Sequence, residues 1–181
     1  MTKKAVFLDR DGVINRAFVD NGVPKPPSTL AEVEILPRAR EALFLLKKLG
    51  FLLIVITNQP DIARGIISKC SADNINKYLM DILPLDEIIP CYHDDDDNCQ
   101  CRKPKPGSIL KAVNLYDIDV KKSFMIGDRW RDIEAGLQSG CKTIFINYGY
   151  KEKQPIGFTF ETTSLYDASI KIKQLEGNCE Y

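Results

Sequence analysis

The sequence has no excess of charge of either sign, no long apolar run and only one histidine. Lysine and arginine number 25 and so do aspartate and glutamate, so bulk charge offers no attraction for nucleic acid. No apolar stretch reaches the roughly 18–20 residues of a membrane span. The apolar segment behind the basic start is too short for a signal peptide. These absences favour a cytoplasmic protein with neither nucleic-acid nor membrane partners.

The chain is long enough to bury a core of its own. It has 181 residues, of which 44% are hydrophobic. No internal repeat, low-complexity linker or domain boundary interrupts it. We therefore expect residues 1–181 to form a single domain that acts as a monomer.

The only histidine lies in a cysteine-rich segment. Cys91-x-His93 is followed by Cys99-x-Cys101, so four metal-ligand side chains fall within eleven residues. Structural Zn²⁺ prefers such tetrahedral Cys₃His sets, because four protein ligands leave no open position for water. Coincidental free thiols are the alternative. If His93 holds zinc, no histidine remains for a Ser-His or Cys-His catalytic pair.

The other cysteines and the acids inside this segment suggest simpler roles. We interpret Cys70, Cys141 and Cys179 as buried or free thiols of a reducing compartment. The run of aspartates at 94–97 reads as a solvated loop rather than a cation site.

Two carboxylates mark the end of the first apolar segment. Residues 5–9 read as a short buried strand ending in Asp9, and Asp11-Gly12 follow. A carboxylate at that point can act as a nucleophile, and its neighbour as an acid and base. An Asx-type turn that closes the strand is the alternative.

Two later apolar segments also end in polar residues. The run 51–57 leads into Asn58, and the run 123–128 ends in Asp128. Continuous runs suit strands buried on both faces of a parallel sheet, whose carboxyl ends bind ligands. Acids for Mg²⁺ and cations for phosphate, the latter supplied by Arg102-Lys103, make one coherent set for phosphoryl transfer.

The remaining segments alternate between strand and helix patterns. Alternation of this kind predicts a parallel sheet with right-handed crossovers. Ser71 is the predicted N-cap of the second helix. Further strands are expected at 88–91 and 142–146, and helices at 37–49, 71–83, 106–116, 130–139 and 164–175.

In this order the motifs resemble those of the haloacid dehalogenase superfamily of phosphohydrolases. The segments that carry the resemblance are Asp9-Arg-Asp11-Gly, Thr57-Asn58, Lys103 and Gly127-Asp128-x-x-x-Asp132. The cysteine-histidine segment resembles, more narrowly, small zinc-clipped phosphatases that act on D-glycero-D-manno-heptose 1,7-bisphosphate or on histidinol phosphate. The match covers roughly residues 4–150. It implies an α/β fold with a Rossmann-like parallel sheet flanked by helices, without a large cap domain.

The resemblance implies a role for each matching residue. Asp9 would form an aspartyl-phosphate, and Asp11 would protonate the leaving group and then deprotonate water. Mg²⁺ would be held by Asp9, the Asp11 carbonyl and Asp128. Phosphate and substrate contacts would come from Thr57, Asn58, Arg102, Lys103 and Arg129. Zinc would be held by Cys91, His93, Cys99 and Cys101.

Two segments bear on the choice of substrate. Residues 57–65 favour removal of the 7-phosphate from heptose bisphosphate over hydrolysis of histidinol phosphate or another sugar phosphate. Residues 17–27 do not reproduce the substrate-contacting loop of the better-known heptose enzymes, and the loop between His93 and Cys99 is short and acidic. A non-enzymatic phospho-acceptor module also places acids at strand ends, but it needs no acid at Asp11.

Overall fold

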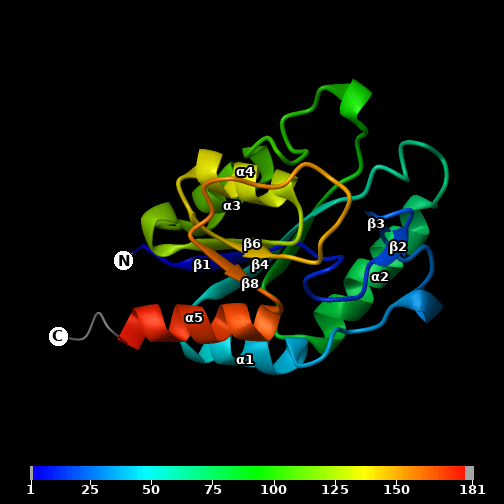
Figure 1. Cartoon of the computed structure of the whole chain (residues 1–181). Coiled ribbons are helices and arrows are strands. Elements are labelled where there is room, and N and C mark those ends of the chain that lie inside the picture. Colours follow the sequence, from blue (N-terminus) through cyan, green and yellow to red (C-terminus); the bar gives the residue numbers. More distant parts are fainter. Residues whose placement is uncertain (1, 178–181) are drawn as a thin grey trace.

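A six-stranded parallel sheet forms the centre of the protein (Figure 1). The computed structural model describes residues 2–177. The strands lie in the order β5-β4-β1-β6-β7-β8, and each pairs in parallel with its neighbours. Their bounds are β1 Ala5–Leu8, β4 Leu52–Asn58, β5 Glu87–Cys91, β6 Phe124–Gly127, β7 Lys142–Ile146 and β8 Phe160–Thr162.

Helices cover both faces of this sheet. Figure 1 shows α1 and α5 on one side, and α3 and α4 on the other. The helix bounds are α1 Ala39–Lys48, α2 Lys69–Ile82, α3 Gly107–Tyr116, α4 Trp130–Ser139 and α5 Leu165–Gly177. Within residues 2–177, no helix combines the length and the apolar character needed to cross a membrane. The predicted Rossmann-like architecture is confirmed, and no large cap is evident in the described part of the chain.

The strands nearest the centre are apolar up to their carboxyl ends because helices pack on both of their faces. All of β1 is buried, as are the five inner residues of β4. Leu8 pairs with Val55 on one side and with Ile126 on the other. The carboxyl ends of β1, β4 and β6 therefore lie side by side, and the polar residues that follow them are brought together.

Most predicted helix boundaries agree with the structure, but one cap differs. The helix α4 spans the predicted range and ends at Gly140, whose φ of +85° suits glycine. For α2 the N-cap is Ser68, not Ser71, and the Ser68 hydroxyl accepts a hydrogen bond from the Ser71 backbone N–H at 3.1 Å. Both serines have the right chemistry, so the helix begins one turn earlier than predicted.

The sequence patterns miss a hairpin and the edge strand β8. The hairpin joins β2 Phe18–Asp20 to β3 Val23–Lys25 through Asn21-Gly22, with φ of 52° and 85°. Asn-Gly is a strong hairpin signal, but Pro24 inside β3 argues against a strand, since proline cannot donate to a ladder. This hairpin occupies the segment that departs from the heptose enzymes.

Candidate active site

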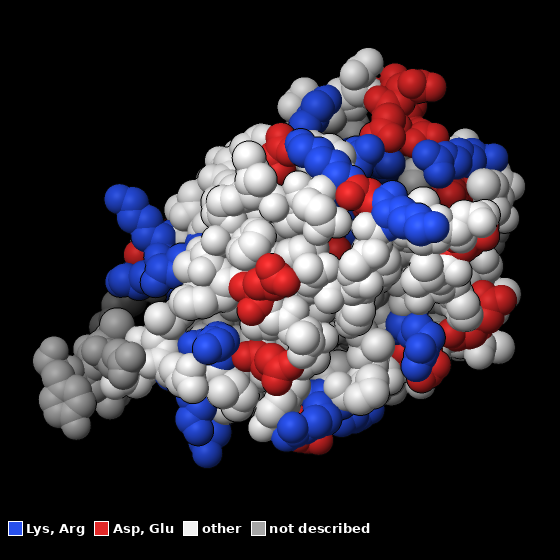
Figure 2. Space-filling model, viewed as in Figure 1, with Lys and Arg blue, Asp and Glu red and all other residues white. Residues whose placement is uncertain are grey.

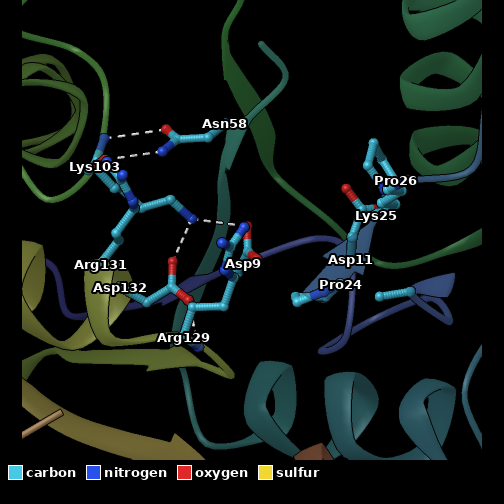
Figure 3. Close-up of a pocket in the computed structure, with 11 residues that line it drawn as sticks. Asp9, Asp11, Pro24, Lys25, Pro26, Asn58, Lys103, Arg129, Arg131 and Asp132 are labelled. Carbon is cyan, nitrogen blue, oxygen red and sulfur yellow. Dashed lines mark hydrogen bonds and ion pairs between the residues drawn. The ribbon is translucent and has the colours of Figure 1, made fainter. Parts of the chain in front are cut away.

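Asp9 and Lys103 meet in a buried ion pair at the end of β1. Asp9 follows the last residue of the strand, is 7% exposed, and has its Oδ1 2.7 Å from Lys103 Nζ. The same ammonium lies 2.5 Å from Asp132 Oδ1 and donates to the Ile56 carbonyl at 2.6 Å. Figure 3 shows the lysine side chain reaching both carboxylates. A cation is thus held beside the carboxylate that is predicted to attack phosphorus.

Burial and the neighbouring charges shift the pKa values of both residues. It raises the pKa of Asp9 to about 6, against the opposing effect of the Lys103 ammonium. Burial alone would lower the pKa of Lys103, but the charges of Asp132 and Asp9 hold it above its usual value. At neutral pH Asp9 is therefore ionised and Lys103 protonated, as a nucleophile and a phosphate-binding cation require.

Asn58 fixes the backbone of Lys103 from the end of β4. Its amide donates to the Lys103 carbonyl at 2.9 Å and accepts from the Lys103 N–H at 3.1 Å. Both polar groups of that peptide segment are satisfied by one side chain. The sequence assigned Asn58 to phosphate; the contacts show that it also orients the lysine.

Asp128 has the features of a metal ligand. Both of its carboxylate oxygens are buried and accept no hydrogen bond of good geometry within residues 2–177, although the Tyr150 hydroxyl is close enough to lower the pKa of Asp128. Ligand oxygens of Asp9, Asp128 and Asp132 lie within 4.8 Å of one another. Burial raises the pKa of Asp128, and the charges of Asp9 and Asp132 add to this effect. Three close carboxylates against one lysine suit a hard divalent cation, which takes oxygen ligands.

Gly12 makes room for this carboxylate. A Cβ on residue 12 would lie 1.9 Å from Asp128 Oδ2, and the φ of +89° also favours glycine. The glycine after Asp11 is therefore required on two independent grounds.

Asp11 is held by residues that the motif analysis did not single out. Arg10 donates to both of its oxygens, at 3.1 and 3.0 Å, and Asn15 donates at 2.9 Å. Arg10 is fully buried, and its other terminal nitrogen donates to Asn76 of α2 at 2.8 Å. Sequence inspection could not reveal this role, because an arginine between two aspartates is usually exposed.

Gln59 is the third residue that donates a hydrogen bond to Asp11. Its amide nitrogen lies 2.7 Å from Asp11 Oδ2 and 2.8 Å from Thr57 Oγ1. Thr57 is 1% exposed and is not among the residues that line the adjacent cavity. Its direct contact with phosphate stays a prediction, whereas its contact with Gln59 links β4 to the acid.

The cavity between these residues and the hairpin contains most of the predicted site. Figure 3 shows Pro24, Lys25 and Pro26 facing Asp9 and Lys103. The full lining is Asp9, Asp11, Ala17, Pro24, Lys25, Pro26, Asn58, Lys103, Arg129, Arg131 and Asp132. The unpredicted hairpin therefore forms one wall of the site.

A second, wider cavity adjoins the first and is rich in cations. The cations that line both cavities are Lys25, Arg129 and Arg131. Arg64 and Arg102 line the wider cavity alone. Figure 2 shows blue and red side chains intermingled at the upper right, around the loop between β5 and α3 in Figure 1. Arg129 pairs there with Glu152, its Nε donating at 2.9 Å. We call this second cavity the outer pocket.

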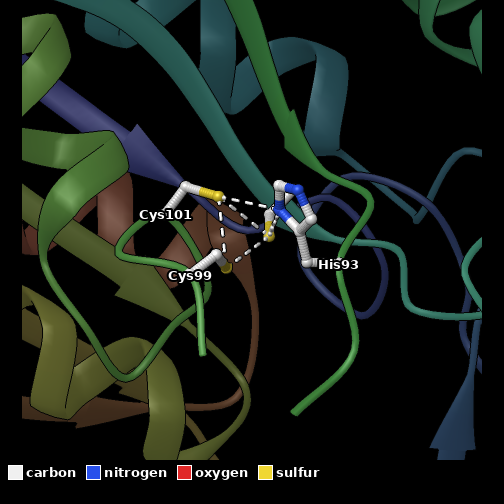
Figure 4. A group of neighbouring side chains, drawn as sticks. His93, Cys99 and Cys101 are labelled. Atoms are coloured by element: carbon white, nitrogen blue, oxygen red, sulfur yellow. Dashed lines mark hydrogen bonds between the residues drawn. The ribbon is translucent and has the colours of Figure 1, made fainter. Parts of the chain in front are cut away.

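The cysteine-histidine segment closes into a tight cluster (Figure 4). Cys101 Sγ lies 3.2 Å from Cys91 Sγ and 3.4 Å from Cys99 Sγ, and 3.3 Å from His93 Nδ1. Four ligands gathered around a common centre suit a tetrahedral metal with sulfur and nitrogen ligands. The structure thus brings together all four predicted zinc ligands.

The cluster is built into the segment that carries Arg102 and Lys103. Ser108 of α3 donates to the Cys101 carbonyl at 3.0 Å, and Lys105 donates to the Cys99 carbonyl at 2.9 Å. A Cβ on Gly107 would lie 2.2 Å from the Gln100 carbonyl oxygen, so the turn needs glycine. The position of the two cations therefore depends on how this loop is held.

Comparison with known proteins places these features in one family. Residues 100–167 match a family model described as HAD-hydrolase-like. The chain is similar to D-glycero-beta-D-manno-heptose-1,7-bisphosphate 7-phosphatase of Helicobacter pylori, with 40% identity over 147 residues that cover 78% of this chain and 82% of the relative. The Pasteurella multocida protein of the same name is 36% identical over 159 residues, covering 81% and 83%.

A solved structure extends the likeness to the whole fold. The D,D-heptose 1,7-bisphosphate phosphatase of B. bronchiseptica, complexed with magnesium and phosphate, superposes with a TM-score of 0.81 and 28% identity, covering 95% of this chain and 99% of that one. With the strand-end acids, the buried lysine and the coverage of both sequence relatives, the comparison settles the family. The chain belongs to the HAD-like hydrolases, in the family of the heptose 1,7-bisphosphate phosphatases.

Proposed function

We propose that this phosphatase removes the 7-phosphate of D-glycero-D-manno-heptose 1,7-bisphosphate. The observation that carries the proposal is the buried Lys103 between Asp9 and Asp132, with Asp11 held beside them at the opening to a cation-rich pocket. The names of relatives at 40% and 36% identity support the same substrate. Family membership favours an enzyme over a phospho-acceptor module.

Asp9 would act as the nucleophile. Its carboxylate attacks phosphorus, the bond between phosphorus and the sugar oxygen breaks, and an aspartyl-phosphate forms. Asp11 gives its proton to the departing oxygen and then takes one from the water that cleaves the intermediate. Arg10, Asn15 and Gln59 keep Asp11 oriented toward the cavity during both steps.

Lys103 and the metal would neutralise the negative charge of the phosphate in the first cavity. The lysine ammonium, fixed through Asn58, binds oxygens of the transferred phosphoryl group. The buried oxygens of Asp128 fit Mg²⁺, with Asp9 as a further ligand, and the family motif adds the Asp11 carbonyl. Bound Mg²⁺ would offset repulsion between Asp9 and an incoming phosphate dianion.

The second phosphate of a bisphosphate would lie in the outer pocket. Arg102 and Arg129 line it, and both are assigned to substrate by the family motif. Histidinol phosphate has no second phosphate to bind at these cations, which pair with the protein's own Asp95 and Glu152. A cytoplasmic location and a monomeric state stay predictions.

Phosphate release from a panel of substrates tests this function. Purified protein with Mg²⁺ should show its highest kcat/KM on heptose 1,7-bisphosphate and lose only the 7-phosphate. Both anomers, histidinol phosphate and simple hexose phosphates complete the panel, with Asp9→Asn as the inactive control. A preference for histidinol phosphate or for a monophosphate would overturn the assignment of substrate.

The pH dependence of magnesium binding follows from the buried acids. The folded-state pKa of Asp9 is raised from 3.8 to about 6, so the folded protein binds more protons than the unfolded chain between these values. Without metal, the contribution of Asp9 to stability therefore falls as pH rises through this window, and Asp128 acts in the same direction. Because Mg²⁺ binds the ionised carboxylates, the rise in Tm that it causes should be larger at pH 7.5 than at pH 5.

Thermal melts with and without Mg²⁺ at each pH measure this difference. The melts with and without Mg²⁺ at one pH contain the same cysteine-histidine cluster, so titration of its side chains affects both Tm values equally. Asp9→Asn should flatten the dependence on pH. A magnesium effect on Tm of equal size at both pH values would contradict the assignment of Asp9 as a ligand.

The cysteine-histidine cluster would be a structural zinc site, which we call the zinc clip, Cys91, His93, Cys99 and Cys101. Purified protein should contain about one Zn²⁺ per chain. Cys99→Ser should reduce zinc content and Tm, and it should both raise KM and lower kcat, because Cys101 adjoins Arg102. Cys70→Ser is the matched control, since Cys70 is exposed and outside the cluster. Full activity of zinc-free protein prepared without chelator would refute a structural zinc.

A further inference from the structure

Asp95 lies between two arginines of the outer pocket. Its Oδ1 accepts from Arg102 Nε at 2.8 Å and from Arg131 Nη1 at 3.0 Å. All three residues line the same pocket. One carboxylate thus bridges two of the guanidinium groups that face the space proposed for the second phosphate.

The loop that carries Asp95 is anchored, and the Asp95 side chain is more exposed than the arginine that it contacts. Its neighbour Asp94 accepts two hydrogen bonds from Arg64, at 2.6 and 2.7 Å, and caps the short turn Asp95–Asp97. The side chain of Asp95 is 53% exposed, whereas that of Arg102 is only 10% exposed. The carboxylate can therefore exchange its arginine contacts for water, while the buried arginine stays in place.

A carboxylate on two guanidinium groups has the same chemistry as a phosphate on them. Both are oxyanions, and arginine binds both through charge-assisted hydrogen bonds. A phosphate monoester has three acceptor oxygens and about two negative charges at neutral pH, so it outcompetes a single carboxylate. A neutral hydroxyl brings no charge to replace that of Asp95. Among ion pairs of the described residues, only the longer contact of 3.7 Å between Asp94 and Arg102 would remain, so a hydroxyl does not displace the carboxylate.

We propose that Asp95 is an internal competitor for the distal phosphate and a specificity-determining residue of the outer pocket. In the free enzyme it occupies Arg102 and Arg131, and the second phosphate of the substrate displaces it on binding. This inference rests on the proposed function, whose substrate carries two phosphates. It predicts that the aspartate weakens binding of bisphosphates and leaves monophosphates unaffected.

Asp95→Asn tests the proposal, because asparagine keeps the shape and removes the charge. KM for heptose bisphosphate should fall about two- to fivefold, the size expected for a partly exposed ion pair. The kcat should stay within about twofold, since the transferred phosphate lies in the other cavity. Asp96→Asn is the matched control: it makes the same charge change in the same loop, and no arginine contact to Asp96 is present in the described structure.

A second assay separates this idea from the choice of substrate. Fructose 1,6-bisphosphate and fructose 6-phosphate are used as inhibitors of p-nitrophenyl phosphate hydrolysis. Asp95→Asn should lower Ki for the bisphosphate by the same factor and leave Ki for the monophosphate unchanged. If the wild type does not hydrolyse heptose bisphosphate, the substrate assignment fails. The Ki values of the two inhibitors in wild type and variant still decide the role of Asp95.

The sign of the effect is decisive. A higher KM or Ki for bisphosphates in Asp95→Asn would show that the carboxylate positions the arginines rather than competes for them. An equal change for both inhibitors, an equal change in Asp96→Asn, or no change at all would also overturn the proposal. Zinc content and Tm equal to the wild type confirm that the loop is intact in both variants.

Discussion

Asp9→Asn should abolish phosphate release while the fold and the proposed zinc site stay intact. An amide cannot attack phosphorus, and removal of a nucleophile costs roughly 10⁴–10⁶-fold in turnover. The fold should survive because Lys103 keeps its contacts with Asp132 and with the Ile56 carbonyl. Phosphate-release assays, zinc content and a thermal melt measure the three quantities on one preparation.

Two further variants sharpen this result. Asp9→Ala, which cannot revert by deamidation, should be equally inactive. Asp132→Asn removes the other carboxylate on Lys103 but leaves Asp9 in place, so it should reduce activity without abolishing it. Retention of more than a few per cent of activity in either Asp9 variant would remove this residue from the role of nucleophile.

The next largest effect is expected from Asp11→Asn. Loss of a general acid and base typically costs roughly 10²–10⁴-fold, and here one group serves both proton transfers. The first step should be less sensitive for p-nitrophenyl phosphate, whose leaving group needs little protonation, than for an alkyl phosphate. Rapid-quench measurement of aspartyl-phosphate formation separates this step from the hydrolysis that follows. Equal losses for the two substrates in that step would argue against proton donation by Asp11.

The structure adds a stability effect to this variant. Arg10 is fully buried and has Asp11 as its ionic partner, with bonds of 3.1 and 3.0 Å. Removing one partner of a buried ion pair leaves an uncompensated charge, which typically destabilises by about 3–5 kcal/mol. Asp11→Asn should therefore lower Tm more than Asp9→Asn does. Kinetics must be measured well below the Tm of this variant.

Much of the fold follows from local patterns. The apolar runs that become β1 and β4 are long enough, and apolar at enough positions, to exclude half-buried strands. Parallel strands place their carboxyl ends at one edge, so the order of motifs along the chain already predicts that Asp9, Asn58 and Asp128 converge. Short spacing likewise predicts the cysteine-histidine cluster, because a single loop closes it.

Other features depend on contacts between distant segments. Arg10 becomes a buried partner of Asp11 because Asn76 of α2 packs over it. Asp95 reaches Arg131 across 36 positions of the chain. The sequence did not predict the hairpin that lines the cavity, because Pro24 contradicts the local pattern of a strand. In the structure Pro24 nevertheless pairs with Val19 of β2.

The sequence by itself determined every strand of the central sheet except β8, the strand-end acids and the cysteine-histidine cluster, since each rests on periodicity or short spacing that tertiary packing preserves. Only the tertiary structure decided how the charges pair. Lys103 bridges Asp9 and Asp132, and Asp95 occupies the arginines of the outer pocket. The physical reason is that an ion pair depends on distance and burial in space, and neither quantity is encoded in the spacing of charged residues along the chain.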